Sequence, residues 1–146
     1  MDVHCIGGFV VSQIHGLGRA TSDLDLAEVI PREQIAEIER LAGRESDLAR
    51  THRVHVQFVG VASLPDSYAS RLVRVHPSLR RLRLWALEAH DLALSKHVIH
   101  LARSGLIQED KLVKRYETEL RPYLSGRTPS CNDATMRMWV EACWPR

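Results

Sequence analysis

The stretch GGFVVSQIHGLGRATSDLDL, residues 7–26, decides how the start of this chain folds. Its two glycines follow the short apolar run VHCI at residues 3–6, and this pattern predicts a strand that ends in a tight turn. Apolar residues at positions 9, 10, 14 and 17 then recur with helical spacing, up to the glycines at 16 and 18. Polar and apolar side chains alternate over residues 21–29, which is typical of a second strand.

Two carboxylates stand one residue apart in this second strand. Because successive side chains of a strand point to opposite faces, Asp23 and Asp25 point the same way, about 7 Å apart along the strand. Like charges placed in this way repel each other unless a cation lies between them. Mg²⁺ is commonly held by one or two carboxylates together with substrate phosphates, so the pair indicates a metal site.

Groups that suit a phosphate precede the two carboxylates. Gly7 and Gly8 expose backbone N–H groups between a strand and a helix, where an anion can be cradled. Arg19 and Ser22 are within reach of phosphate oxygens. The combination suits phosphoryl or nucleotidyl transfer assisted by metal ions. Taken alone, an Asp-x-Asp strand is more often a solvated face, and a Gly-Gly turn is weaker still.

The same combination resembles the nucleotidyltransferase superfamily typified by DNA polymerase β. More closely, the chain resembles the small bacterial DUF6036-type nucleotidyltransferases, relatives of toxin–antitoxin nucleotidyltransferases. Two later stretches add to the likeness, ASLPDSYASRLVRVH at residues 62–76 and LRLWALEAHDLALSK at residues 82–96. The resemblance assigns the family's motif residues to positions of this chain: the glycines to Gly7 and Gly8, the Arg-x-Thr to Arg19 and Thr21, and the metal aspartates to Asp23 and Asp25.

Relatives also carry a helical lysine followed about a dozen residues later by an acidic pair. Lys96 and Glu109-Asp110 are the matching positions. The resemblance implies that Lys96 contacts a triphosphate or orients the site and that Asp110 braces it. The alternative is an exposed helix lysine and a solvated acidic pair.

Active members of the superfamily usually carry a third carboxylate on a neighbouring strand. The segment RVHVQFVGV at residues 53–61 is the candidate strand, and it offers His55 and Gln57 instead. A neutral glutamine ligates Mg²⁺ poorly and cannot act as a base. Either the third acid comes from elsewhere in the chain, or the site binds nucleotide with weak or no turnover. The acids considered for this role are Asp66, Glu88 and Asp91.

The pattern of the rest of the chain predicts an α+β protein with a helical C-terminal part. The resemblance implies the minimal nucleotidyltransferase fold, in which a short mixed sheet is flanked by helices. We expect a single domain over residues 1–146, with a sheet-containing core at 1–87 and a helical portion at 88–146. The individual expectations are a helix at 31–48, strands at 54–61, 71–76 and 80–87, helices over 91–124, a loop at 125–133 and a last helix at 134–144.

Composition is that of an ordinary globular protein, with 146 residues, 45% hydrophobic residues and a formal net charge of +2. No apolar run approaches the roughly 18 residues that span a membrane, and no secretory leader is apparent. The three cysteines, at 5, 131 and 143, are too few and too scattered for a disulfide framework. We therefore expect a cytoplasmic protein. Five arginines between residues 71 and 83 are either an RNA-facing patch or a solvated sheet face.

The motif and above all the resemblance imply an enzyme that moves a nucleoside monophosphate from an NTP onto an acceptor hydroxyl of tRNA or protein, with Mg²⁺ or Mn²⁺ as cofactor. The alternative is a catalytically degenerate module that binds nucleotide, or acts as an antitoxin, beside a cognate toxin or antitoxin.

Overall fold

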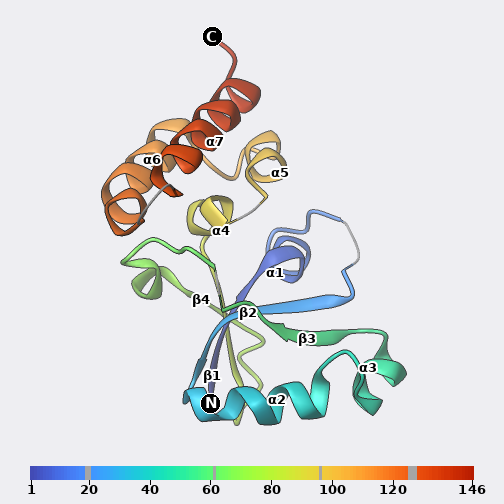
Figure 1. The fold of residues 1–146 in the computed structure, drawn as a ribbon. Coiled ribbons are helices and arrows are strands. Elements are labelled where there is room, and N and C mark those ends of the chain that lie inside the picture. The colour runs from blue at the N-terminus through green and yellow to red at the C-terminus, as the bar shows by residue number, and fades with distance from the viewer. Residues whose placement is uncertain (19–20, 61, 96, 125–127) are drawn as a thin grey trace. The chain divides into compact units, whose positions relative to one another are not determined.

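The computed structural model describes residues 1–18, 21–60, 62–95, 97–124 and 128–146. The chain divides into two compact units (Figure 1). Unit 1 comprises Met1–Ala62 and Leu72–Leu87, and unit 2 comprises Ser63–Arg71 and Glu88–Arg146. A short central segment therefore belongs to the second unit before the chain returns to the first. That the two units make up one domain stays a prediction.

Unit 1 contains the sheet and the helices beside it. Its elements are β1 (Asp2–Ile6), α1 (Gly7–Gln13), β2 (Asp23–Ile30), η1 (Arg32–Gln34), α2 (Ile35–Ala42), α3 (Asp47–His52), β3 (His55–Phe58), β4 (Val73–Val75) and β5 (Arg83–Ala86). The described residues form one five-stranded sheet in the order β3-β2-β1-β5-β4. β1 pairs antiparallel with β2 and parallel with β5, β3 pairs parallel with β2, and β4 pairs antiparallel with β5. The predicted α+β fold with a short mixed sheet is confirmed.

The register gives the sheet one apolar face and one polar face. Residues directly opposite each other on paired strands share a face. The apolar face carries buried residues from four strands: Val3, Cys5, Leu26, Val29, Val75, Leu84 and Ala86. The opposite face carries most of the polar strand residues: Asp2, His4, Asp23, Asp25, Glu28, His55, Gln57, Arg74, Arg83 and Trp85. Both aspartates of the sequence motif thus lie on the polar face.

A β-bulge between β1 and β2 allows this arrangement. His4 lies opposite Glu28, but Cys5 lies opposite Leu26, so Ala27 is an extra residue on β2. Leu26 and Val29 are three residues apart and would point to opposite faces of a regular strand. The bulge places both on the apolar face. It also reverses the face of the sheet to which the residues before Ala27 point.

The helix predicted over residues 31–48 is wrong as one continuous element. It consists of η1 and α2, and a separate helix, α3, follows and extends to His52. Gly43 ends α2 in an extended conformation, where an added Cβ would lie 2.3 Å from the Glu39 carbonyl oxygen. The Ser46 hydroxyl then caps α3 by accepting the N–H of Ala49 at 3.1 Å. Gly43 therefore ends one helix, and Ser46 begins the next.

Unit 2 is helical. Its elements are η2 (Tyr68–Arg71), α4 (Ala89–Ser95), α5 (Val98–Arg103), α6 (Glu109–Arg115), the π-helical turn η3 (Tyr116–Leu120), η4 (Arg121–Tyr123) and α7 (Thr128–Cys143). α4 packs against α5 and α6, and α5 packs against α7. Leu92, Leu101 and Leu112 are completely buried at the centre of these contacts.

The loop predicted over residues 125–133 is wrong from residue 128 onward, because α7 already begins at Thr128. Pro129 lies in the first turn, where a missing N–H costs nothing, so the loop-like composition TPSCND suits a helix start. Residues 125–127 of this predicted loop lie outside the described part of the chain.

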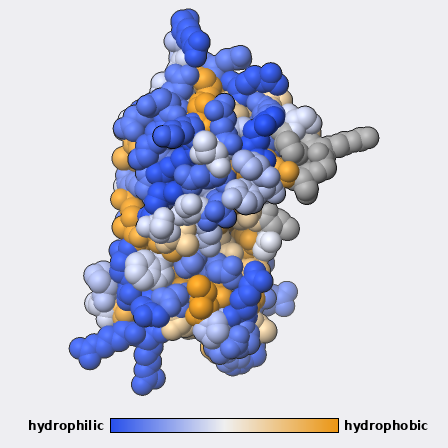
Figure 2. Space-filling model, turned by 90° about the vertical axis from the view of Figure 1, so that its left-hand side faces the viewer, coloured by the Kyte–Doolittle hydropathy of each residue, from blue (hydrophilic) through white to orange (hydrophobic). Residues whose placement is uncertain are grey.

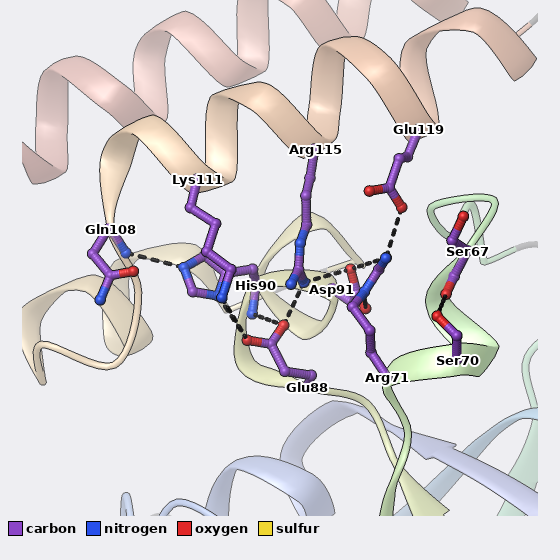
Figure 3. Close-up of polar contacts among 10 residues, drawn as sticks. All are labelled: Ser67, Ser70, Arg71, Glu88, His90, Asp91, Gln108, Lys111, Arg115 and Glu119. Atoms are coloured by element: carbon purple, nitrogen blue, oxygen red, sulfur yellow. Dashed lines mark hydrogen bonds and ion pairs between the residues drawn. The ribbon is translucent and has the colours of Figure 1, made fainter.

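A buried carboxylate joins the segment Ser63–Arg71 to the helices of unit 2 (Figure 3). Asp91 is completely buried. Its Oδ2 accepts a hydrogen bond from Arg71 Nε at 2.8 Å, and its Oδ1 accepts from Arg71 Nη2 and Arg115 Nη1, each at 2.9 Å. Arg71 Nη2 also donates to Glu119 Oε2 at 2.8 Å. Charged groups paired this closely satisfy one another away from water.

Glu88 extends the same network. Its Oε1 lies 2.8 Å from His90 Nδ1, and its Oε2 accepts a hydrogen bond from Arg115. His90 Nε2 accepts the backbone N–H of Gln108 at 3.1 Å, so Nδ1 carries the ring proton and donates to Glu88. Burial alone would raise the pKa of Glu88, but the hydrogen bonds from His90 and Arg115 outweigh it and hold that pKa well below its usual range.

Exposed hydrophobic residues are scattered. On the face shown in Figure 2 they form small patches separated by hydrophilic residues. None of the helices in the described part of the chain is long and apolar enough to cross a lipid bilayer.

The first prediction concerns the buried carboxylate. Asp91→Asn leaves the guanidinium groups of Arg71 and Arg115 without their shared counter-charge, so the free energy of unfolding should fall by about 3–5 kcal/mol. The control is Glu37→Gln, which breaks the exposed pair with Arg40 and should leave the free energy of unfolding almost unchanged. Urea denaturation measures both values. Equal losses in the two variants would contradict a structural role for the network.

The second prediction concerns pH. The lowered pKa of Glu88 in the folded chain contributes stability that is complete above the ordinary glutamate pKa of about 4.3 and is lost as the pH falls below it. The free energy of unfolding should therefore decrease less steeply between pH 6 and pH 3 in Glu88→Gln than in the wild type. Urea denaturation across this range tests it, and identical pH profiles would refute it.

Candidate functional site

A glycine turn lies directly against one of the two aspartates. β1 ends at Ile6, which is paired with Asp25 on β2, and the next residue, Gly7, has a φ of +74°. A Cβ added at Gly7 would lie 2.3 Å from Asp25 Oδ2 and 3.2 Å from its Cγ. Residue 7 must therefore be glycine for two reasons, its left-handed backbone and the carboxylate packed on it. The helix α1 begins at this same residue, directly after β1.

The second glycine packs against Thr21. A Cβ added at Gly8 would lie 3.2 Å from the Cβ and from the Oγ1 of Thr21. Thr21 Oγ1 accepts the backbone N–H of Asp23 at 3.2 Å, which fixes the entry into β2. The fold thus brings together Gly7, Gly8, Thr21 and Asp25, which the sequence had grouped only by motif. Arg19 and Lys96, also predicted for the site, lie outside the described residues.

Asp23 is the first residue of β2 and lies beside β3. Ser22 Oγ donates to Asp23 Oδ1 at 2.8 Å, and His55 Nε2 lies 3.5 Å from the same oxygen. The Asp23 side chain is 43% exposed, so the carboxylate is accessible to a ligand from solution. Ser22, predicted to contact phosphate, is therefore hydrogen-bonded to the carboxylate that follows it.

The neighbouring strand carries no third acid at this position. His55 lies opposite Asp23, and Gln57 lies opposite Asp25, as the sequence had suggested. Elsewhere, the carboxylates of Glu88 and Asp91 are hydrogen-bonded to arginines within unit 2, which makes them poor candidates for the role.

The donor set fits a magnesium-like ion only if substrate oxygens complete it. In the part of the chain that the structure describes, no group of three His, Cys, Asp or Glu side chains could hold a metal ion by itself. Mg²⁺ is often bound through only one or two carboxylates, with phosphate oxygens and water filling the remaining positions. Asp23 and Asp25 meet that requirement.

Hollows near the residues of interest lie in both units. In unit 1, a hollow of about 450 Å³ is lined by His55 and Gln57 together with Arg44 and Ser46. In unit 2, a hollow of about 870 Å³ lies between α6 and α7, with Tyr116 in its wall. Burial, aided by a hydrogen bond to Asp133, raises the pKa of Tyr116 to about 12.

The predicted acidic pair has a local position in unit 2. Glu109 and Asp110 occupy the first turn of α6, where negative charge complements the helix dipole. Arg71 of the predicted arginine patch belongs to the Asp91 network. Arg74 instead lies over the Trp85 ring, 5.2 Å from its centroid.

Comparison with known proteins agrees with this geometry. A family model described as a nucleotidyltransferase of unknown function (DUF6036) matches residues 2–123. No curated protein and no solved structure matches the chain. The chain therefore belongs to the DUF6036 family of nucleotidyltransferases. The matched residues include every strand of the sheet and end before α7.

The third prediction concerns the contact of Gly7 with Asp25. Gly7→Ala introduces backbone strain and a methyl group that overlaps the carboxylate, whereas Gly16→Ala introduces similar strain at a φ of +63° with nothing within 4 Å. Overpacking costs about 1–3 kcal/mol, so Gly7→Ala should lower the free energy of unfolding by that much more than Gly16→Ala.

A double-mutant cycle assigns this excess to the carboxylate. In an Asp25→Ala background, Gly7→Ala and Gly16→Ala should cost the same within about 0.5 kcal/mol. Chemical denaturation of the variants measures both differences. If Gly7→Ala still lowers the free energy of unfolding more than Gly16→Ala without the Asp25 carboxylate, the added methyl group clashes with a different atom.

Proposed function

We propose that this chain is a divalent-metal-dependent nucleotidyltransferase that moves a nucleoside monophosphate from an NTP onto an acceptor hydroxyl. The observation that carries the proposal is the packing of Gly7 on the Asp25 carboxylate. This contact joins the turn suited to a triphosphate to a strand that carries two carboxylates on one face. Membership of a nucleotidyltransferase family supports the same reaction class.

In this proposal some residues of unit 1 bind the metal ion and the phosphates, and others position the binding residues. Asp23 and Asp25 hold Mg²⁺ or Mn²⁺, which neutralises the triphosphate and the leaving pyrophosphate. Backbone N–H groups at Gly7 and Gly8 bind phosphate oxygens. Thr21 orients the start of β2 through its hydrogen bond with Asp23. Each of these groups is positioned by backbone structure before any ligand arrives, which lowers the cost of ordering the site.

The transfer itself is a substitution at phosphorus. The acceptor oxygen forms a bond to the α-phosphorus, the bond from that phosphorus to the oxygen bridging to the β-phosphate breaks, and pyrophosphate leaves. The acceptor hydroxyl proton passes to solvent, which is consistent with the exposure of Asp23. Arg19 and Ser22, which precede the aspartates, are further phosphate contacts in this proposal, and the resemblance to the family adds Lys96. The acceptor is tRNA or protein.

A second candidate function is a nucleotide-binding module without turnover, such as an antitoxin paired with a cognate toxin. The observation that favours it is the pair His55 and Gln57 opposite the two aspartates, where an active enzyme usually has an acid. The two candidates differ in one measurable property, which is the transfer of label from NTP to an acceptor.

The fourth prediction tests the transfer. Wild-type protein is incubated with each α-labelled NTP in turn, Mg²⁺ or Mn²⁺, and total bacterial tRNA or protein extract. Label should appear in one acceptor class, and Asp23→Asn and Asp25→Asn should each reduce the rate at least about 100-fold, because several kcal/mol of charge stabilisation are lost.

The matched control is Glu28→Gln. Glu28 lies on the same face of β2 beyond the bulge and is paired with Arg32, so its loss should change the rate less than about twofold. Transfer that persists in both aspartate variants would refute the proposed site. NTP binding without any transfer by the wild type would favour the module without turnover.

A further inference from the structure

We propose that His55 is a ligand of the metal ion at this site, together with Asp23, and that the site therefore prefers a first-row transition-metal ion such as Mn²⁺ over Mg²⁺. This inference rests on the proposed function, since it concerns the same site. It assigns a role to a residue that occupies the position of the expected third carboxylate.

The distance between the two side chains is that of two ligands of one ion. His55 Nε2 lies 3.5 Å from Asp23 Oδ1, which is too long for a good hydrogen bond. Two donors, each about 2.1–2.2 Å from a shared ion and separated by an angle of about 90–110°, lie about 3.0–3.5 Å apart. The separation of these two atoms therefore matches that of two ligands of one ion.

The Nε2 atom of His55 has no hydrogen-bond partner within the described residues. His55 Nε2 is buried and makes no hydrogen bond there. A buried polar atom left in this state costs free energy unless a partner is supplied. A metal ion is such a partner, and the neutral ring offers its lone pair at this nitrogen.

The two side chains are held in place before an ion binds. The backbone N–H of His55 donates to the Ser22 carbonyl at 2.8 Å, which continues the pairing of β2 with β3 beyond Asp23. The His55 side chain is only 12% exposed, so its ring is confined, whereas Asp23 remains open to solvent. The open side of Asp23 leaves room for phosphate oxygens and water around an ion.

The ligand types determine the preference. Mg²⁺ favours oxygen donors, whereas an imidazole nitrogen suits transition-metal ions. Gln57, opposite Asp25, adds no negative charge, and the proposed ligand pair of Asp23 and His55 supplies one carboxylate and one imidazole nitrogen. Replacing the expected acid by His55 thus does not remove the site; it changes the ion that the site selects.

The test uses Mn²⁺ as the probe with the full chain. Electron paramagnetic resonance of free Mn²⁺ gives the Kd, and pulsed measurements report whether a nitrogen nucleus is coordinated. The wild type should show nitrogen coordination. His55→Leu should lose this signal and raise the Kd for Mn²⁺ at least about tenfold, while the Kd for Mg²⁺, measured by competition, should change less than about threefold.

Two further variants keep the outcome decisive. His55→Asp restores an oxygen donor and should shift the preference toward Mg²⁺. His52→Leu replaces the exposed histidine at the end of α3 and should leave both the nitrogen signal and the Kd unchanged. Circular dichroism confirms that each variant is folded.

The failure of this inference differs from the failure of the proposed function. Mn²⁺ binding that requires Asp23 but shows no nitrogen coordination, with His55→Leu equal to the wild type, would overturn the role of His55 and leave the aspartate site standing. Absence of Mn²⁺ binding to the wild type, both alone and with an NTP, would overturn both.

Discussion

One extra residue on β2 determines where the two aspartates point. Asp23, Asp25 and Val29 are separated by even numbers of residues, so in a regular strand all three would share the buried apolar face of the sheet. The bulge at Ala27 reverses the alternation, which leaves Val29 with Val3 and turns the carboxylates to the polar face. Two carboxylates forced into an apolar layer would be costly, so the bulge makes the motif compatible with the sheet. The remaining features of the site depend on this reversal.

The glycine turn adds a second constraint, which acts at close range. Register places Asp25 opposite Ile6, and the chain then leaves β1 through a residue with no side chain. The carboxylate occupies the volume that a Cβ would fill. A turn suited to phosphate and a carboxylate suited to a metal are therefore adjacent because of backbone pairing. Both are positioned by the backbone before a ligand binds, which lowers the cost of ordering them.

The sequence predicted those parts of the fold that depend on local patterns. The order of strand, helix and strand at residues 3–29 follows from periodicity, and so does the helical part after residue 88. The face of the aspartates was not predictable, because the bulge depends on pairing between β1 and β2. The break at Gly43 and the early start of α7 were missed because both depend on short capping segments.

The individual roles of charged residues were the hardest to predict. The sequence predicts Arg71 as part of an arginine-rich strand. Its hydrogen-bond partners, Asp91 and Glu119, lie 20 and 48 residues away along the chain. In the sequence, His55 indicates only that the expected third acid is missing. Its distance to Asp23 in the structure is what suggests a metal ligand. Composition and spacing cannot report such contacts, because they arise from packing between elements distant in sequence.

A crystal structure of the full chain with Mn²⁺ and a non-hydrolysable NTP analogue would show whether a metal ion and a triphosphate bind together at the two aspartates. Anomalous scattering locates manganese independently of the nucleotide. We expect a manganese peak in contact with the carboxylates of Asp23 and Asp25, with the triphosphate at Gly7 and Gly8. A nucleotide bound elsewhere, for example between α6 and α7, with no metal at the two aspartates, would contradict this expectation.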